Sequence, residues 1–484
     1  MSYERWRCVN QLITLNSSLI TMKVITIIDV GKTNKKLFLF DRQYRIVWER
    51  TEQFPETTDD DGDPCEDLNR LTEWMLSAIR EVLALPQFEV QAINFSGYGA
   101  SLVYLDANGQ PVGYLYNYLK SYPDAIRQQF YDHYGPADVL SVQTASPALD
   151  SLNSGLMLYR IKYDKPELFG HIRYVLHLPQ YLSYIVTRQP LSDLTSIGCH
   201  TMLWDFTKNQ YHDWVTAEGL DALMGDLFPA DKAMIAQLSD GQTLLAGVGL
   251  HDSSAALIPY LASFQDSPFV LISTGTWCIS MNPFNNERIT AEELQYDCLC
   301  YLTYKGEPVK ASRLFAGYEH EQQTKRLAKH FGVGVDRYKQ IRYDADLIQT
   351  LQQTTLDVQP AEGLIPPVVM PSLAGSAFGG RDLTRFDDYE TAYHQLVLDI
   401  MAGQLISTAL VLPSPGQPGV TRIFVDGGFS QNQIYMNLLS AAFPDMDVLA
   451  ASVAQATALG AALAIHDEWN PLPIPSDLIT LTKY

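Results

Sequence analysis

Short apolar runs bounded by turn residues open the chain, and a comparable set opens its second half. Runs of about four to eight apolar residues between turns are typical of buried strands. They fall at residues 24–28, 37–40 and 46–50 in the first half, and at 270–272, 278–280 and 298–301, with Thr303 before Gly306, in the second. The repetition predicts a sheet of hairpin strands in each half, joined by a mainly helical middle section.

Longer stretches repeat apolar residues every three to four positions, which is the period of an amphipathic helix. The clearest runs from Glu66 to Leu85, and others are predicted at 173–187, 316–331, 390–410, from about Gln433, and at 456–462. In the last of these, alanine and glycine allow close packing. Further strands are expected at 90–95, 103–106, 111–112 and 422–426. The alternation predicts a duplicated α/β domain with a cleft between the two halves.

Length and composition fit this architecture. A chain of 484 residues exceeds what one core usually serves, so two domains are expected. A formal charge of -21 argues against nucleic acid as a partner but allows a small anion at a local site. Six scattered cysteines suit a reducing compartment, and Cys298-x-Cys300 has no His or further Cys pair nearby to complete a metal site.

The chain has no apolar run of membrane-spanning length and no basic start leading into an apolar segment. We therefore expect a cytoplasmic protein that needs no membrane. Residues 1–21 precede the first clear strand, and we expect them to be an extension that the fold does not require.

The acidic segment from Thr57 to Asp67 contains the spacing Asp59-x-Asp61-x-Asp63, which invites comparison with a calcium loop. An EF-hand counted from Asp59 needs glycine where Pro64 stands and glutamate where Arg70 stands. We therefore expect a solvated loop that caps the following helix.

The stretch 246–277, where the two halves meet, contains the candidate chemistry. His251 and Asp252 precede a helix start, and the run 269–273 ends in the turn Thr274-Gly275-Thr276. A carboxylate there can accept a proton from a hydroxyl, while the amides of the turn hold phosphate oxygens. This pattern favours phosphoryl transfer, with a helix N-cap as the alternative role of Asp252.

Three further glycine turns follow apolar runs, at Asp29–Asn34, Ser96–Ala100 and Asp426–Asn432. The first joins strand to strand, unlike a Walker loop. With its motifs in this order, the chain resembles the FGGY family of carbohydrate kinases, in the actin-like, sugar kinase and Hsp70 ATPase superfamily. The resemblance runs from Val24 to about His466. It implies two duplicated actin-like (ribonuclease H-like) α/β domains with an active-site cleft between them.

The resemblance also implies an ATP and Mg²⁺ site built from two phosphate loops, an adenosine motif and a metal ligand. The first phosphate loop contains Gly31, Thr33 and Asn34, and the second contains Gly275 and Thr276. The adenosine motif contains Gly427, Gly428, Ser430 and Asn432, and the metal ligand is Asp29. At position 32 this chain has a lysine where many members of the family have a small residue. Lys32 either reaches a phosphate or keeps the loop soluble.

On the sugar side, the resemblance makes Asp252 the general base, with Ser96, Gly97, Tyr98 and His251 as substrate contacts. Packing is an equally favoured role for Tyr98 and His251. The segments 96–100 and 178–187 resemble the L-rhamnulose and L-fuculose kinase branch. The favoured acceptor is therefore the primary hydroxyl of L-rhamnulose, ahead of L-fuculose. Another pentulose or polyol kinase, or a non-catalytic nucleotide-binding regulator, are the alternatives.

The expected organisation follows from these motifs. Residues 22–260 form the N-terminal domain, with the sugar site, the first phosphate loop and the base. Residues 261–484 form the C-terminal domain, with the second phosphate loop and the adenosine site. The expected partners are the sugar and ATP, without nucleic acid or membrane, and the chain could form a homodimer.

Overall fold

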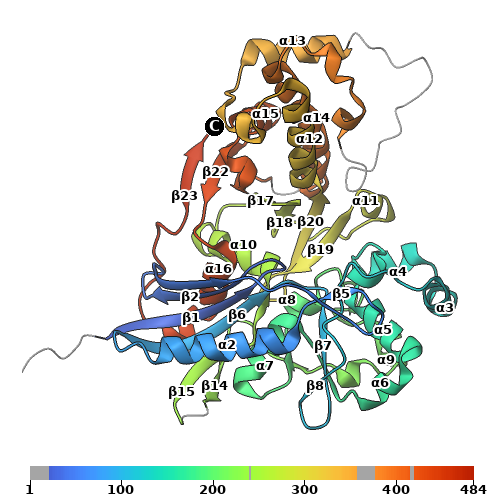
Figure 1. The fold of residues 1–484 in the computed structure, drawn as a ribbon, viewed down its shortest axis with the longest axis vertical. Coiled ribbons are helices and arrows are strands. Elements are labelled where there is room, and N and C mark those ends of the chain that lie inside the picture. Colours follow the sequence, from blue (N-terminus) through green and yellow to red (C-terminus); the bar gives the residue numbers. More distant parts are fainter. Residues whose placement is uncertain (1–20, 239–240, 357–375, 415–418) are drawn as a thin grey trace, which may run out of the picture.

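The computed structural model describes residues 21–484 except 239–240, 357–375 and 415–418. Of the expected N-terminal extension, residues 1–20 lie outside the described residues. The described chain forms two α/β lobes, one from each half, with α10 and α16 between them (Figure 1).

The first lobe is built on a sheet whose strand order is β14-β15-β6-β1-β2-β3, with β16 also paired to β6. Its strands are β1 (Met22–Val30), β2 (Lys35–Asp41), β3 (Ile46–Glu52), β6 (Phe88–Gly97), β14 (Ala233–Gln237), β15 (Thr243–Gly247) and β16 (Leu250–His251). β1 is antiparallel to β2 and parallel to β6. The glycine turn at 31–34 is therefore a hairpin loop, as predicted.

The second lobe repeats this arrangement in the order β19-β20-β18-β17-β21-β22-β23. Its strands are β17 (Phe269–Thr274), β18 (Cys278–Asn282), β19 (Cys298–Leu302), β20 (Pro308–Leu314), β21 (Arg422–Gly427), β22 (Asp447–Ser452) and β23 (Thr480–Lys483). β17 is antiparallel to β18 and parallel to β21, as β1 is antiparallel to β2 and parallel to β6. The shared order of the inner strands confirms the duplicated fold.

The helices cover the sheets and fill the space between the lobes. They include α2 (Leu68–Leu83), α10 (Asp252–Ser263), α12 (Ala316–Phe331), α14 (Tyr389–Val411), α15 (Gln433–Ala442) and α16 (Ala456–Ala464). α14 is also long and apolar enough, by length and composition, to cross a membrane, with a mean hydropathy of 1.2. It packs in the core of the second lobe, where Leu396, Val397 and Ile400 are buried.

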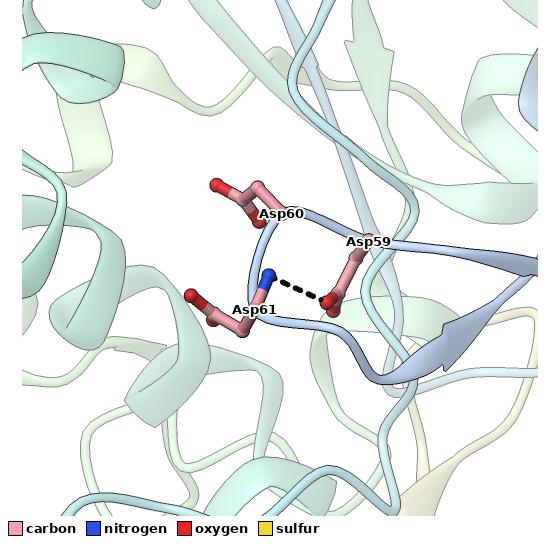
Figure 2. Close-up of side chains that lie close together, drawn as sticks. All are labelled: Asp59, Asp60 and Asp61. Atoms are coloured by element: carbon pink, nitrogen blue, oxygen red, sulfur yellow. Dashed lines mark hydrogen bonds between the residues drawn. The ribbon is translucent and has the colours of Figure 1, made fainter.

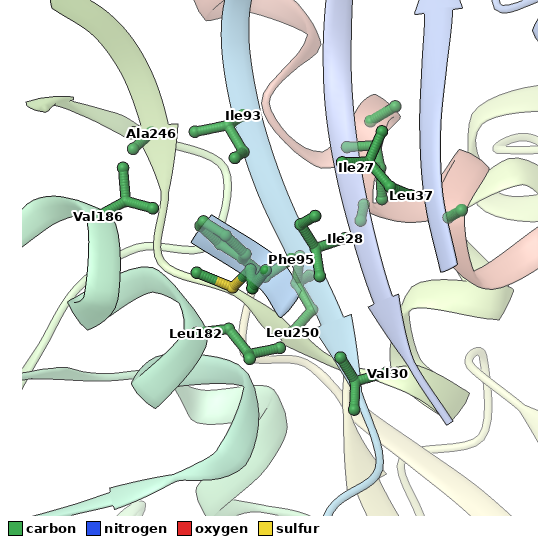
Figure 3. Packing of buried hydrophobic residues seen from close by; sticks show 14 of the residues in the cluster. Ile27, Ile28, Val30, Leu37, Ile93, Phe95, Leu182, Val186, Ala246 and Leu250 are labelled. Carbon is green, nitrogen blue, oxygen red and sulfur yellow. The ribbon is translucent and has the colours of Figure 1, made fainter. Parts of the chain in front are cut away.

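The core of the first lobe contains residues from both ends of the chain. Ile27, Ile28 and Phe95 from β1 and β6 pack with Leu182 and Val186, as Figure 3 shows. Alanines and leucines of α16 belong to the same cluster, although α16 comes from the second half. The small residues of α16 pack closely on α10, as predicted, because a Cβ on Gly460 would lie 1.8 Å from the Ala255 carbonyl oxygen.

The middle section differs from the prediction in one place. The apolar stretch 173–187 is a strand, β9 (Tyr174–His177), followed by α7 (Leu178–Thr187), because a short apolar run fits either state. The polar segment 192–201 is buried and contains a short helix, α8 (Leu194–Ile197). The middle helices α3 (Asp124–Tyr134), α4 (Ala137–Thr144), α5 (Ser154–Asp164) and α6 (Pro166–His171) precede them.

The acidic segment contains a feature that the sequence did not predict. It is a tight turn between β4 (Thr57–Thr58) and β5 (Pro64–Cys65), in which Asp59 accepts a hydrogen bond from the Asp61 amide (Figure 2). The ammonium group of Lys120, itself 1% exposed, lies 2.5, 2.7 and 3.1 Å from the carboxylates of Asp59, Asp61 and Asp63. Most of the loop is exposed, as predicted, and Asp67 caps α2. The internal cation that the loop encloses was not predicted.

Candidate active site

Three parallel strands of the first lobe end at one edge of the sheet and bring the predicted motifs together. In the register of β1 and β6, Asp29 pairs with Ser96 and Val30 with Gly97. In the register of β6 and β16, Gly97 pairs with His251. The carboxyl ends of neighbouring parallel strands are where α/β folds place their ligands. The register therefore gathers the first phosphate loop, the sugar segment and the His251–Asp252 pair.

Asp252 is the first residue of α10, and its side chain is 33% exposed. The hydrogen bonds that it receives from the described residues fall on Oδ1, from the amide and hydroxyl of Ser253, and Nε2 of His251 lies 3.2 Å from the same oxygen. Oδ2 is thus left to accept a bond from a ligand. Burial raises the pKa of Asp252 to about 6, so the carboxylate is ionised at neutral pH.

His251 lies beside Asp252 as a neutral ring. The ring is buried, and burial lowers its pKa to about 4, so its Nε2, 3.2 Å from Oδ1 of Asp252, belongs to an uncharged imidazole. The His251 amide donates to the Thr195 hydroxyl over 3.0 Å. The polar segment around α8 therefore fixes the backbone of the predicted pair.

Asp29 lies at the end of β1, and its Oδ2 accepts a 2.9 Å hydrogen bond from Thr457 at the start of α16. Burial raises the pKa of Asp29 to about 6, against the lowering effect of Thr457, and the Asp252 carboxylate raises it further. Two carboxylates close enough to affect each other, with nearby hydroxyl groups, form the oxygen-rich donor set that Mg²⁺ prefers. The residues present fit a magnesium ion.

The loop between β1 and β2 exposes Thr33, while the Gly31 amide donates to the Asn34 carbonyl. Its lysines have different partners. Lys32 pairs with Glu56 at 2.7 Å, and Lys36 donates to the side chain of Gln455. Lys32 is therefore held by a carboxylate in this structure, and its side chain is still partly exposed beside the loop.

The second lobe forms the opposite wall with a matching pair of strand ends. β17 and β21 run parallel, so that Thr274 pairs with Gly427. Gly427 has a φ of +85°, and a Cβ there would lie 2.0 Å from the Thr274 carbonyl oxygen. Gly317, at the start of α12, approaches the Gly275 carbonyl equally closely. Only glycine fits at these two contacts.

A pocket with a volume of about 760 Å³ opens beside these turns. It is lined by Gly275, Gly428 and Asn432 from the predicted motifs, and by residues that the sequence did not single out: Gly317, His320, Tyr338 and Tyr393 among them. A volume of this size accommodates a nucleotide. Gly427 and Ser430 are not among its lining residues. The Ser430 hydroxyl instead donates to the Gly427 carbonyl and fixes the turn.

Two hydrogen bonds organise the inner end of the pocket. The Tyr393 hydroxyl contacts Nε2 of His320 at 2.9 Å and accepts from the Asn432 amide at 2.8 Å. Burial lowers the pKa of His320 to about 4, so the ring is neutral and suited to a polar, uncharged ligand surface. These residues come from three helices, and only the Gly-Gly-Phe-Ser motif left a signal in the sequence.

The remaining predicted sugar contacts are buried around the strand ends. Ser96 is fully buried, and its hydroxyl lowers the pKa of the neighbouring Asp29. Tyr98 is 8% exposed and donates to Glu66 at 3.3 Å. Thr457 was not predicted to belong to the site, because in the sequence it looks like an ordinary threonine at the start of a helix.

Comparison with known families supports this arrangement. Residues 24–230 match the model of the FGGY family of carbohydrate kinases, N-terminal domain, and residues 266–472 match the model of the carbohydrate kinase FGGY, C-terminal domain. Together the two matches cover most of the chain.

Solved structures share the fold. A carbohydrate kinase from Novosphingobium aromaticivorans aligns with a TM-score of 0.74 and 23% identity over 95% of each chain. A ligand-bound xylulose kinase from Lactobacillus acidophilus gives 0.75 and 15%, over 96% of this chain and 93% of that one. An ADP-containing glycerol kinase from Plasmodium falciparum gives 0.69 and 15%, over 93% and 90%. The chain belongs to the FGGY family of carbohydrate kinases and is a sugar kinase.

Proposed function

We propose that this sugar kinase transfers the γ-phosphate of ATP to the primary hydroxyl of a ketose, with Asp252 as the general base. The observation that carries the proposal is the environment of Asp252. Its Oδ1 accepts the bonds from Ser253 and lies beside His251, while no hydrogen bond from the described residues reaches Oδ2. A carboxylate with a pKa of about 6 is ionised at neutral pH and basic enough to accept the hydroxyl proton as the oxygen attacks phosphorus.

The chain contributes positioning and charge stabilisation to the rest of the reaction. The turns at 31–34 and 274–276 would hold the phosphates through amides other than those of Gly31 and Gly275, which donate to nearby backbone carbonyls. This suits phosphoryl transfer because its transition state is stabilised mainly by position and charge. Asp29 would hold Mg²⁺, which neutralises charge on the phosphate oxygens when bound. The pocket beside Gly428 and Asn432 would hold the nucleoside. We also propose that the enzyme acts in the cytoplasm.

The acceptor is proposed from the segment Ser96–Ala100 and its resemblance to the L-rhamnulose and L-fuculose branch. L-rhamnulose is our first candidate and L-fuculose the second. Some solved structures of similar fold are described as xylulose, gluconate and glycerol kinases, so those acceptors belong in the comparison. A shared fold does not fix the substrate, and related kinases can differ in their acceptor.

The test is ADP release, coupled to a spectrophotometric readout, with L-rhamnulose, L-fuculose, L-ribulose, D-xylulose, D-gluconate and glycerol. We expect the highest kcat/KM with L-rhamnulose and no release without a sugar. A higher kcat/KM with another compound reassigns the acceptor. Release with none of them, from protein that binds ATP, would favour a nucleotide-binding regulator. Light scattering on the same sample tests the possible homodimer.

A further inference from the structure

A buried charge at the start of β2 has no explanation in the proposed chemistry. Lys35 has a side chain that is 1% exposed, and its ammonium group lies 2.6 Å from Glu66, which is 5% exposed. Taking both charges out of water is costly, and an apolar pair of similar size is often as stable. Burial of this pair therefore points to a role other than stability.

The contacts of this pair form a closed ring of five residues, which includes the backbone carbonyl of Lys32. Lys35 donates to the Lys32 carbonyl at 3.1 Å, and Glu66 accepts from the Tyr98 hydroxyl at 3.3 Å. The Tyr98 ring meets the edge of Tyr118 with centroids 5.9 Å apart. The Lys32 ammonium lies 5.9 Å above the Tyr118 ring, which closes the ring.

Two of its members belong to different parts of the site. Lys32 is in the first phosphate loop, and Tyr98 is in the segment proposed to contact the sugar. Burial raises the pKa of Tyr118, and the carboxylates of Asp252 and Glu56 raise it further. The ring is therefore a continuous path of contacts between the phosphate loop and the sugar segment.

We propose that the ring of Lys32, Lys35, Glu66, Tyr98 and Tyr118 couples the first phosphate loop to the sugar segment, so that nucleotide binding orders the sugar site. This rests on the proposed function, because it takes the loop at 31–34 as the phosphate site. Lys35 and Glu66 are positioning residues, which act through Lys32 and Tyr98. Coupling between two sites requires such a physical connection and is reciprocal.

The variant that opens the ring is Lys35→Met/Glu66→Gln. It leaves no unpaired buried charge, and glutamine still accepts from Tyr98, so the change removes the bond to the phosphate loop selectively. The matched control is Lys162→Met/Glu218→Gln. Lys162 of α5 pairs with Glu218 at 2.5 Å, and Glu218 accepts hydrogen bonds from Tyr134 and Tyr163. This ion pair belongs to neither phosphate loop. Tyr98→Phe opens the ring at another edge and serves if the double variant does not fold.

The readout is hydrogen–deuterium exchange of residues 96–105 and 114–122 with and without Mg²⁺ and a non-hydrolysable ATP analogue. In the wild type and the control, we expect nucleotide to slow exchange in both segments by about fivefold or more. In the ring variants we expect that effect to disappear, and KM for the sugar at saturating ATP to rise more than kcat falls. Unchanged protection in both ring variants, or none in the wild type, overturns the inference.

The proposed function is tested separately by the acceptor panel. Turnover of a sugar combined with unchanged protection in the ring variants rejects the coupling and leaves the kinase assignment. Protection lost in the ring variants without turnover of any acceptor rejects the acceptor assignment and leaves the coupling.

Discussion

Thr457 donates a hydrogen bond to Asp29 over 2.9 Å, although the two residues lie 428 positions apart. The donor belongs to the second half of the chain and the acceptor to its first strand. This bond orients the carboxylate that we propose as the Mg²⁺ ligand.

We therefore predict that Thr457→Val weakens metal binding. Loss of a residue that orients a ligand typically costs about tenfold or more in metal affinity. The Mg²⁺ concentration for half-maximal activity should rise by that factor, and titration of ADP release with MgCl₂ measures it. Thr144→Val, which removes another buried threonine hydroxyl in a helix, is the control and should leave the titration unchanged.

Asp252→Asn should lower kcat by about 100-fold or more, because a positioned base contributes at least that much to the rate. Affinity for a non-hydrolysable ATP analogue should stay within about threefold of wild type. Calorimetric titration and ADP release measure the two quantities. Turnover near the wild-type rate would remove the general-base assignment.

The same substitution should make the metal-free protein more stable above pH 6. The pKa of Asp252 in the folded protein, about 6, exceeds its ordinary value of 3.8, so wild-type stability falls as pH rises through about 6. Asparagine removes that loss. Discounted for its partial exposure, we expect a gain of about 1 kcal/mol at pH 8 and none at pH 3, measured by urea denaturation.

Activity should follow the opposite course with pH. The base works as a carboxylate, so kcat/KM should fall as pH drops below about 6, the pKa of both Asp252 and Asp29. His251, with a pKa of about 4, stays neutral over this range and should add no second step. A profile of kcat/KM from pH 5 to 9 checks this, and a flat profile down to pH 5 would contradict it.

Gly427→Ala should weaken ATP binding by about tenfold or more, because its Cβ would overlap the Thr274 carbonyl and force the two strand ends apart. Fluorescence titration with a nucleotide analogue gives the affinity. Gly334→Ala is the control, since its φ is -65° and open space surrounds the added atom. It should bind like the wild type.

Lys120→Ala should destabilise the fold by about 3 kcal/mol, because it leaves the buried Asp59 carboxylate without its partner. Millimolar Ca²⁺ should recover part of that loss by entering the acidic loop, with no effect on the wild type. Thermal denaturation with and without Ca²⁺ measures both. Lys339→Ala removes an exposed ion pair with Asp336 and should change stability by less than about 0.5 kcal/mol.

Local patterns predicted the elements that carry their own signal. The helix 316–331 appears with those bounds because its apolar face and terminal Gly332 are both local. The position of β20 between β18 and β19 could not be predicted, since strand order depends on contacts far apart in sequence. The strand at 174–177 was misassigned because only the proline at 179, in the first turn of the helix, marks the boundary.

The site shows the same division. The glycine turns could be recognised because small residues directly after an apolar run are typical of ligand-binding turns. The His251–Asp252 pair could be recognised because it stands directly before a helix start. The buried ion pair of Lys35 and Glu66 gave no such signal, because a charged residue in a sequence indicates a solvated surface. The partners of Asp29 and Asn432 are set by tertiary packing alone.

The contact of Gly460 with the Ala255 carbonyl has a mechanical consequence. Asp252 starts one of these helices, and Thr457, which donates to Asp29, lies in the first turn of the other. The distance between the carboxylates of Asp252 and Asp29 therefore depends on how the two helices pack. At this contact they meet backbone against backbone, with no side chain between Gly460 and the Ala255 carbonyl to absorb a displacement. Thermal motion of one helix should therefore displace the other as well. The proposed base and metal ligand should keep their relative positions when the surrounding loops move.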